Sequence, residues 1–135
     1  MDDAARNEFD ALVERQVAGL PYTVQLLLEE TPLVVEDHPS DALLQELGLS
    51  SEESDELCGV YCGLGMLERS VEDSFTEPET ITIFRRGIRL LAESQVDDDH
   101  ALEELLLKEI RITILHEIGH HFGLDEDDLE AIGYA

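Results

Sequence analysis

The sequence is poor in cysteine and in aromatic residues. Its 135 residues include two cysteines, four phenylalanines, three tyrosines and no tryptophan. The cysteines, Cys58 and Cys62, are too few for the disulfide framework of a small secreted protein, and they lack the second pair that a four-ligand structural zinc site needs. We therefore expect free, partly buried thiols in a reducing compartment, and a core made mainly of leucine and isoleucine.

Basic residues are also scarce, with 8 lysines and arginines against 33 acids and a formal net charge of −25. Such a field repels phosphate backbones and anionic lipid surfaces, so neither nucleic acid nor a membrane is an expected partner. Basic peptides and metal cations are the partners it attracts, although the charge also serves solubility or adaptation to a salty interior. Five of the eight bases lie between Arg85 and Arg111, and this segment is expected to pair with acids elsewhere in the chain.

Long apolar runs are absent. No run approaches the roughly 20 apolar residues that span a bilayer. The first residues, MDDAARNEFDALVERQ, lack the basic start and the apolar stretch of a signal peptide, so we expect a cytoplasmic protein. With 43% hydrophobic residues, the chain is long enough for one domain with a real core and too short for two. One domain over residues 1–135 is therefore expected.

The spacing of apolar residues predicts an α+β fold with a small sheet and one dominant helix. Helices are predicted where apolar residues recur every three or four positions: residues 3–18, 22–30, 40–49, 88–93 and 97–123. Strands are predicted in short segments rich in β-branched residues: residues 32–37, 57–64 and 80–86. The polar stretches 50–56 and 68–79 are predicted to be a connector and an exposed loop.

Finer expectations follow from particular residues. In TITIFRR, residues 80–86, threonines alternate with isoleucines, which is the pattern of a half-buried strand. Such a strand could lie at the edge of the sheet and pair with an extended peptide, but an interior position fits the pattern equally well. The acids of residues 97–99 are placed to cap the long helix. Gly48 and Gly123 are placed to end helices, Gly123 in the left-handed conformation.

The segment LHEIGHHFGLDED, residues 115–127, carries the chemistry. His116 and His120 are four residues apart, so on a helix they lie about 40° apart around the axis and reach one point outside it. Glu117 lies beside His116, where it can act on a water molecule held at that point. This is the pattern H-E-x-x-H, in which two histidines bind zinc and the glutamate is a general base. The competing interpretation is a charged helix end with solvated histidines.

A catalytic zinc site needs a third protein ligand. Gly123 can turn the chain back sharply, and Glu126 then falls ten residues after His116. An oxygen ligand from this turn would complete the site, with Asp125 and Asp127 as the neighbouring alternatives. His121 projects about 140° away from His116, so we expect it to lie outside the ligand set.

The segment HEIGHHFGLDEDDL resembles the active-site helix of the compact bacterial zincin-like metalloproteases, which carry H-E-x-x-H-x-x-G-x-x-D. PLVVEDHPS and TITIFRR also lie where this family has similar segments. The resemblance implies a minimal zincin-like domain, with a small mixed sheet packed on a long active-site helix. It implies zinc on His116 and His120, with Glu117 as the base. Glu126 occupies the family's aspartate position, which is a departure from the pattern.

A second departure concerns the larger zincins. The only methionines, Met1 and Met66, precede the motif, so the Met-turn of metzincins has no counterpart here. The usual C-terminal subdomain is also not expected, because only nine residues follow Glu126. The upstream half of the chain is therefore expected to hold the substrate.

These residues predict a zinc-dependent peptidase in which the metal polarises a peptide carbonyl and Glu117 transfers the proton of the attacking water to the leaving amine. The expected partner is a peptide or protein substrate, with basic ones favoured by charge. Tyr134 is a candidate donor to the anionic intermediate, and Glu109 and Thr113, on the face of His116, are candidates for orienting a ligand. Ordinary packing or capping is the alternative for these three. The alternative function is a non-catalytic, zinc-stabilised acidic interaction module.

Overall fold

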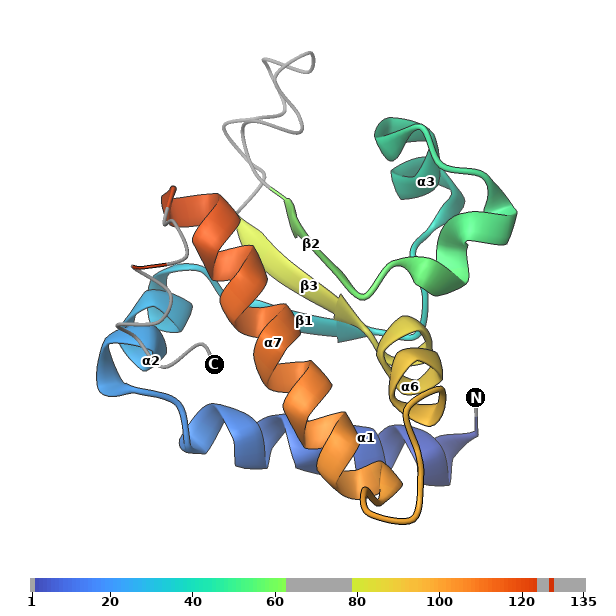
Figure 1. Ribbon diagram of the computed structural model, residues 1–135. Helices are drawn as coiled ribbons and strands as arrows, with labels where there is room; N and C mark the ends of the chain where they lie inside the picture. The colour runs from blue at the N-terminus through green and yellow to red at the C-terminus, as the bar shows by residue number, and fades with distance from the viewer. Residues whose placement is uncertain (1, 63–78, 124–126, 128–135) are drawn as a thin grey trace, which may run out of the picture.

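The computed structural model describes residues 2–62, 79–123 and 127, except for the side chains of Cys62 and of residues 120–122. These residues form a mixed α+β structure in which helices pack on a small sheet (Figure 1). In chain order the elements are α1 (Asp3–Ala18), α2 (Tyr22–Glu30), β1 (Leu33–Glu36), α3 (Asp41–Leu47), the 3-10 helix η1 (Ser51–Glu56), β2 (Gly59–Cys62), β3 (Thr80–Phe84), α6 (Arg85–Glu93) and α7 (Leu102–Phe122). The α+β class predicted from the sequence is confirmed.

The described sheet has three strands in the order β1-β3-β2. β1 is parallel to β3 and β2 is antiparallel to it, so Thr82 of β3 pairs with Val34 on one side and Val60 on the other. The sequence left an edge and an interior position open for residues 80–86, and the structure has the interior one. The half-buried pattern predicted for this strand was wrong. β3 is the central strand of this sheet, and Thr82 is buried along with Ile81 and Ile83 because both faces of the strand are covered.

The core lies between α7 and the sheet. α7 contacts α1, α6, β2 and β3, and Figure 1 shows it running across one face of the sheet. The buried core residues of α7 are Leu105, Leu106, Ile110, Ile114, Leu115 and Ile118. They pack against apolar side chains from the other helices and from β3, among them Phe9, Leu12, Val24, Ile83 and Ile88. None of the helices in the described part of the chain has the length and apolar character needed to cross a membrane.

Several helices end at residue types that are favoured at helix ends. Asp2 caps α1, because its side chain accepts a hydrogen bond of 2.8 Å from the backbone of Ala5. Ser40 caps α3 in the same way. Gly48 and Gly123 end α3 and α7 with φ of 72° and 64°, a left-handed conformation that glycine adopts without strain.

The start of α7 differs from the prediction. The helix begins at Leu102, so residues 97–99 do not cap it. Asp97 instead stabilises the preceding turn, where its Oδ1 accepts hydrogen bonds from the backbone N–H groups of Asp99 and His100 at 2.9 and 2.7 Å. The Asp97 carboxylate therefore stabilises the turn, and the N-cap residue of α7, Ala101, makes no side-chain hydrogen bond to the helix.

Two other boundaries were also wrong. α6 begins at Arg85, directly after β3, and Gly87 lies inside it. A Cβ at Gly87 would overlap the carbonyl oxygen of Leu57, so glycine is needed there for packing and does not mark a helix start. The polar connector contains the 3-10 helix η1, where the backbone N–H of Ser50 donates to the carboxylate of Glu53 at 3.2 Å. Most of the predicted loop at 68–79 lies outside the described residues.

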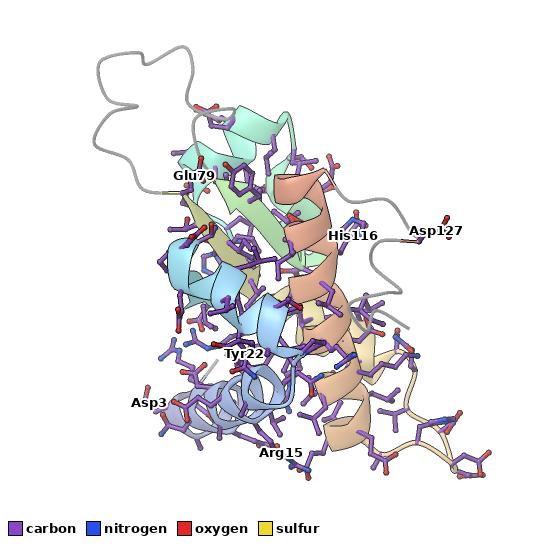
Figure 2. The ribbon with its side chains drawn as sticks, turned by 90° about the vertical axis from the view of Figure 1, so that its left-hand side faces the viewer. Asp3, Arg15, Tyr22, Glu79, His116 and Asp127 are labelled. Carbon is purple, nitrogen blue, oxygen red and sulfur yellow. The ribbon has the colours of Figure 1, made fainter. Side chains whose placement is uncertain are left out.

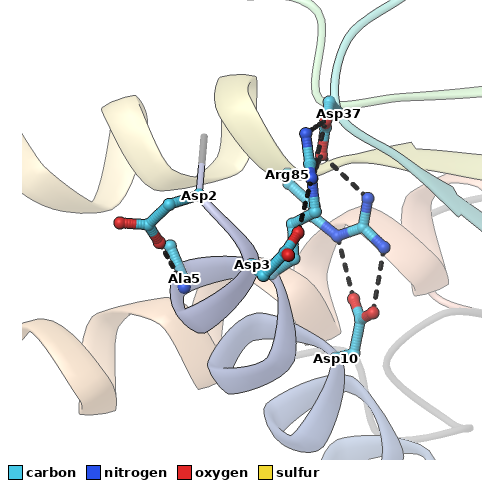
Figure 3. Close-up of polar contacts among 7 residues, drawn as sticks. Asp2, Asp3, Ala5, Asp10, Asp37 and Arg85 are labelled. Atoms are coloured by element: carbon cyan, nitrogen blue, oxygen red, sulfur yellow. Dashed lines mark hydrogen bonds and ion pairs between the residues drawn. The ribbon is translucent and has the colours of Figure 1, made fainter.

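Basic residues of α6 pair with acids from distant elements, as the sequence predicted. Arg85 donates to Asp10 of α1 and to Asp37, which follows β1, at 2.9 Å in each case (Figure 3). Arg6 of α1 donates to the same Asp37 carboxylate at 2.7 Å. Two arginines thus share one acid and link α1, α6 and the end of β1. Hydrogen bonds from Arg6, and then from Arg85, hold the pKa of Asp37 below its usual value of 3.8.

This shift makes the stability of the fold depend on pH. Because the pKa of Asp37 is lower in the folded state, its contribution is complete above pH 3.8 and is lost as pH falls below that value. We expect Asp37→Asn to lower the free energy of unfolding by about 1 kcal/mol at pH 7, and the difference from wild type to shrink in acid. Thermal unfolding between pH 7 and strongly acidic conditions measures this difference. Asp3→Asn is the control, because Asp3 contacts Arg6 at 3.0 Å but its side chain is 91% exposed.

Candidate functional site

His116 and Glu117 occupy successive positions on α7 and point in different directions. Neighbouring positions on a helix are about 100° apart, so one side chain can face solvent while the next faces the core. His116 is exposed, and Figure 2 shows it pointing outward from α7. Glu117 is only 7% exposed. The motif therefore places the His116 imidazole at the surface and the Glu117 carboxylate in the interior.

The other predicted metal ligands are only partly within the described structure. The backbone of His120 lies in α7, one turn after His116, and Gly123 ends the helix in the left-handed conformation that was predicted. The side chains of His120 and His121, and residues 124–126 with Tyr134, lie outside the described residues. Asp127 is described and exposed. Within the described part of the chain, no three His, Cys, Asp or Glu side chains are grouped to hold a metal ion.

A pocket of about 530 Å³ lies beside His116 and Glu117, and we call it the α7 pocket. One of its walls is a single face of α7, made by Glu109, Ile112, Thr113, His116 and Glu117. These positions recur at spacings of three and four, which place side chains in a row along one side of a helix. Glu109 and Thr113 therefore share the face of His116, as the sequence predicted, and both are buried.

The opposite wall is mainly apolar and comes from three segments of the chain. Its residues are Leu47 at the end of α3, Leu57 and Cys58 before β2, Gly59 and Val60 in β2, and Leu91 of α6. Leu91 is 42% exposed, so it lies where the pocket opens to solvent. The pocket is thus a mainly apolar space next to the two motif residues.

β2 lies very close to α7 at Gly59. A Cβ at this position would be 2.7 Å from Cγ2 of Thr113 and 3.4 Å from Cγ of Glu117. Since real Cβ atoms do not approach so closely, only glycine fits here without a shift of strand or helix. The sequence indicated this approach through the glycine inside a predicted strand. The contact sets the distance between β2 and the Glu117 carboxylate.

Glu109 lies at the end of the α7 pocket away from the motif. It is 6% exposed, and its Oε1 accepts a hydrogen bond of 3.1 Å from Nε2 of Gln95. Burial raises the pKa of the Cys58 thiol, and the negative charge of Glu109 raises it further. Cys58 is a free, half-buried thiol, which agrees with the sequence prediction for this cysteine.

The pocket walls outside α7 were not predicted from the sequence. Leu47, Leu57 and Leu91 are three of many leucines, and no local pattern distinguishes a leucine that lines a pocket from one that fills the core. Their positions depend on how α3, β2 and α6 pack together. The contact between Gly87 and the Leu57 carbonyl, which holds the segment before β2 against α6, is part of that packing.

Comparison with known proteins identifies one related family. The family described as zincin-like metallopeptidase matches residues 28–134. This range includes every residue of the α7 pocket and the whole of the segment from His116 to Glu126. A comparison with curated proteins gives no match.

Proposed function

Because the chain belongs to the zincin-like metallopeptidase family, we propose that it is a zinc-dependent peptidase. The observation that carries this proposal is the place of the motif. The family match covers H-E-x-x-H, and the same helix face that bears His116 and Glu117 lines a pocket large enough for part of a peptide. Peptides or proteins are the substrates that this family membership implies.

The proposed zinc ligands are His116, His120 and Glu126. Zincin-like metallopeptidases generally bind zinc, and imidazole and carboxylate are donors that zinc accepts. The exposed position of His116 supports the assignment, since a ligand must reach out of the helix to meet the ion. The backbone of α7 carries His120 one turn after His116 on the same side, and Gly123 ends the helix in a left-handed conformation. Asp125 and Asp127 are the neighbouring alternatives to Glu126.

Glu117 is the proposed general base. When bound, zinc would polarise the substrate carbonyl and lower the pKa of a water molecule toward about 7. The carboxylate of Glu117 lines the α7 pocket beside His116, so it can accept a proton from water and deliver it to the leaving amine nitrogen. Its burial limits competition from bulk solvent, and Gly59 keeps β2 against it.

The described sheet also offers a place for the substrate backbone. β2 is an edge strand in the order β1-β3-β2, and its residues Gly59 and Val60 line the pocket. An extended peptide that pairs with an edge strand obtains main-chain hydrogen bonds and directs alternate side chains into the pocket. We therefore propose β2, in place of the central strand β3, as the strand that orients the substrate.

We further propose that residues 1–135 form one zincin-like domain. The family match begins at residue 28, after α1. However, Phe9, Leu12 and Val13 of α1 belong to the same buried cluster as Ile110 and Ile114 of α7. A helix that shares the core of the matched region supports a single folding unit.

The proposed activity predicts that the protein contains zinc and that it cleaves peptides in a zinc-dependent way. We expect about one zinc per chain in the purified full-length protein, measured by elemental analysis. We expect cleavage of an unbiased peptide library, measured by mass spectrometry, with loss of cleavage after chelation and recovery on adding zinc. Protein that holds one zinc but leaves every peptide intact would instead favour the non-catalytic interaction module.

A further inference from the structure

Glu109 is a buried acid without a basic partner in the described part of the chain. Its one described hydrogen bond there comes from the neutral amide of Gln95, at 3.1 Å to Oε1. No fully buried side-chain oxygen in the described residues lacks a hydrogen-bond partner, so Oε2 of Glu109 must reach the surface of the pocket. An unpaired carboxylate in a largely apolar pocket is costly, and a cation supplied by a ligand would compensate its charge.

The walls beside Glu109 suit an aliphatic chain. Leu57, Leu91 and Ile112 line the same pocket as the carboxylate. Lysine and arginine side chains combine an apolar stem with a terminal cation, so they can pack along apolar walls and place the charge at a polar end. A short polar side chain leaves these walls uncovered, and an acidic one is repelled by Glu109.

The distance from the proposed base also requires a long side chain. Glu109 and Glu117 are eight positions apart on α7, which corresponds to about 12 Å along the helix axis. The bond to be cleaved lies next to Glu117, so a substrate side chain that reaches Glu109 must extend along α7 from it. Lysine and arginine are the longest natural side chains that end in a positive charge, and the Glu109 side chain and the hydrogen bond to it span part of the separation.

From these observations we propose that the α7 pocket binds a lysine or arginine side chain of the substrate, with its cation at Glu109 and its stem along Leu57, Leu91 and Ile112. The proposal rests on the proposed function for the position of the cleaved bond beside Glu117. It assigns Glu109 a role in substrate selection, with no part in the transfer of protons at the cleaved bond.

The test compares two peptides of nearly equal shape. Each is a blocked alanine-glycine hexapeptide, with one lysine in the first and norleucine, which lacks the ammonium group, in the second. Binding is measured by calorimetry on zinc-loaded, full-length Glu117→Gln protein, which does not consume the peptide. We expect the lysine peptide to bind about 10- to 100-fold more tightly, the range for a hydrogen bond to a charged group.

Matched variants separate the pocket from the overall charge of the protein, which attracts any cation. Glu109→Gln keeps the shape of the side chain and an acceptor for Gln95, and it is expected to abolish the preference for lysine. Glu104→Gln is the control, since Glu104 is exposed in the first turn of the same helix and its replacement changes the net charge equally. It should leave the preference intact.

The outcomes distinguish this inference from the proposed function. Equal binding of the two peptides to the Glu117→Gln protein, or an equal loss in Glu109→Gln and Glu104→Gln, overturns the assignment of Glu109 even if the wild type cleaves peptides. Tight lysine binding that depends on Glu109 supports the assignment even if no peptide is cleaved. The comparison of lysine with norleucine needs no change at Glu109, so equal binding of the two peptides overturns the assignment even if Glu109→Gln fails to fold.

Discussion

Replacing Glu117 with glutamine is expected to lower kcat for peptide cleavage by about 10²- to 10⁴-fold, the usual contribution of a general base or acid. Glutamine has nearly the same volume, so it fills the buried space between α7 and β2, but it cannot accept the proton of water. Zinc content is expected to stay at the wild-type level, because the proposed ligands are His116, His120 and Glu126. The measurements are kcat on a cleaved library peptide, elemental zinc analysis and the melting temperature.

Glu104→Gln is again the matched control, because it is the same chemical change at an exposed position of α7. Its kcat should equal that of the wild type. A Glu117→Gln protein that holds zinc, melts like the wild type and still cleaves within about threefold of its rate would remove Glu117 from the mechanism. A drop in melting temperature with loss of zinc would mean that the residue acts through the fold.

Replacing His116 with alanine is expected to weaken zinc binding by more than about 100-fold, since even residues that only orient a ligand contribute 10- to 100-fold. Peptide cleavage should disappear with the metal. Because His116 is exposed and contributes nothing to the buried core, the metal-free variant should melt close to metal-free wild type. Competition with a zinc chelator of known affinity measures the loss.

His100→Ala is the control for this prediction. His100 is an exposed histidine in the turn before α7, and its Nδ1 lies 2.9 Å from Asp97. Its replacement should leave zinc affinity and cleavage unchanged. If both histidine variants bind zinc as the wild type does, the metal lies elsewhere. If His116→Ala unfolds the protein while Glu117→Gln leaves binding of a basic partner intact, the interaction module is the better description.

Much of the fold could be predicted from the sequence because local chemistry determines it. Helical spacing gave α1 and α2 with the bounds that the structure has, and the helix ends at Gly48 and Gly123 followed from the residue type. The helix that carries the motif was also identified, with Glu109 and Thr113 on the face of His116. These features depend on contacts between residues that are near one another in sequence.

The errors arose where distant contacts decide the structure. An alternation of threonine and isoleucine cannot reveal whether a strand has one neighbour or two, and β3 has two. Gly87 is required by the carbonyl of Leu57, thirty residues earlier, so its meaning could not be read from the local sequence. For the same reason the motif located one wall of the α7 pocket, while Leu47, Leu57 and Leu91 became visible only in the folded chain.

The close contact between Gly59 and Thr113 makes the position of the proposed base independent of the residues that decide which side chains the pocket accepts. The close approach of Gly59 to Thr113 and Glu117 sets the gap between β2 and the proposed base, whereas Leu57 and Leu91 line other parts of the pocket. Substitutions at Leu57 and Leu91 can therefore change which side chains the pocket accepts without moving the proposed reacting groups. The substrate preference of this fold can thus be altered by substitution at the two leucines, whereas Gly59 cannot be replaced without moving β2 or α7.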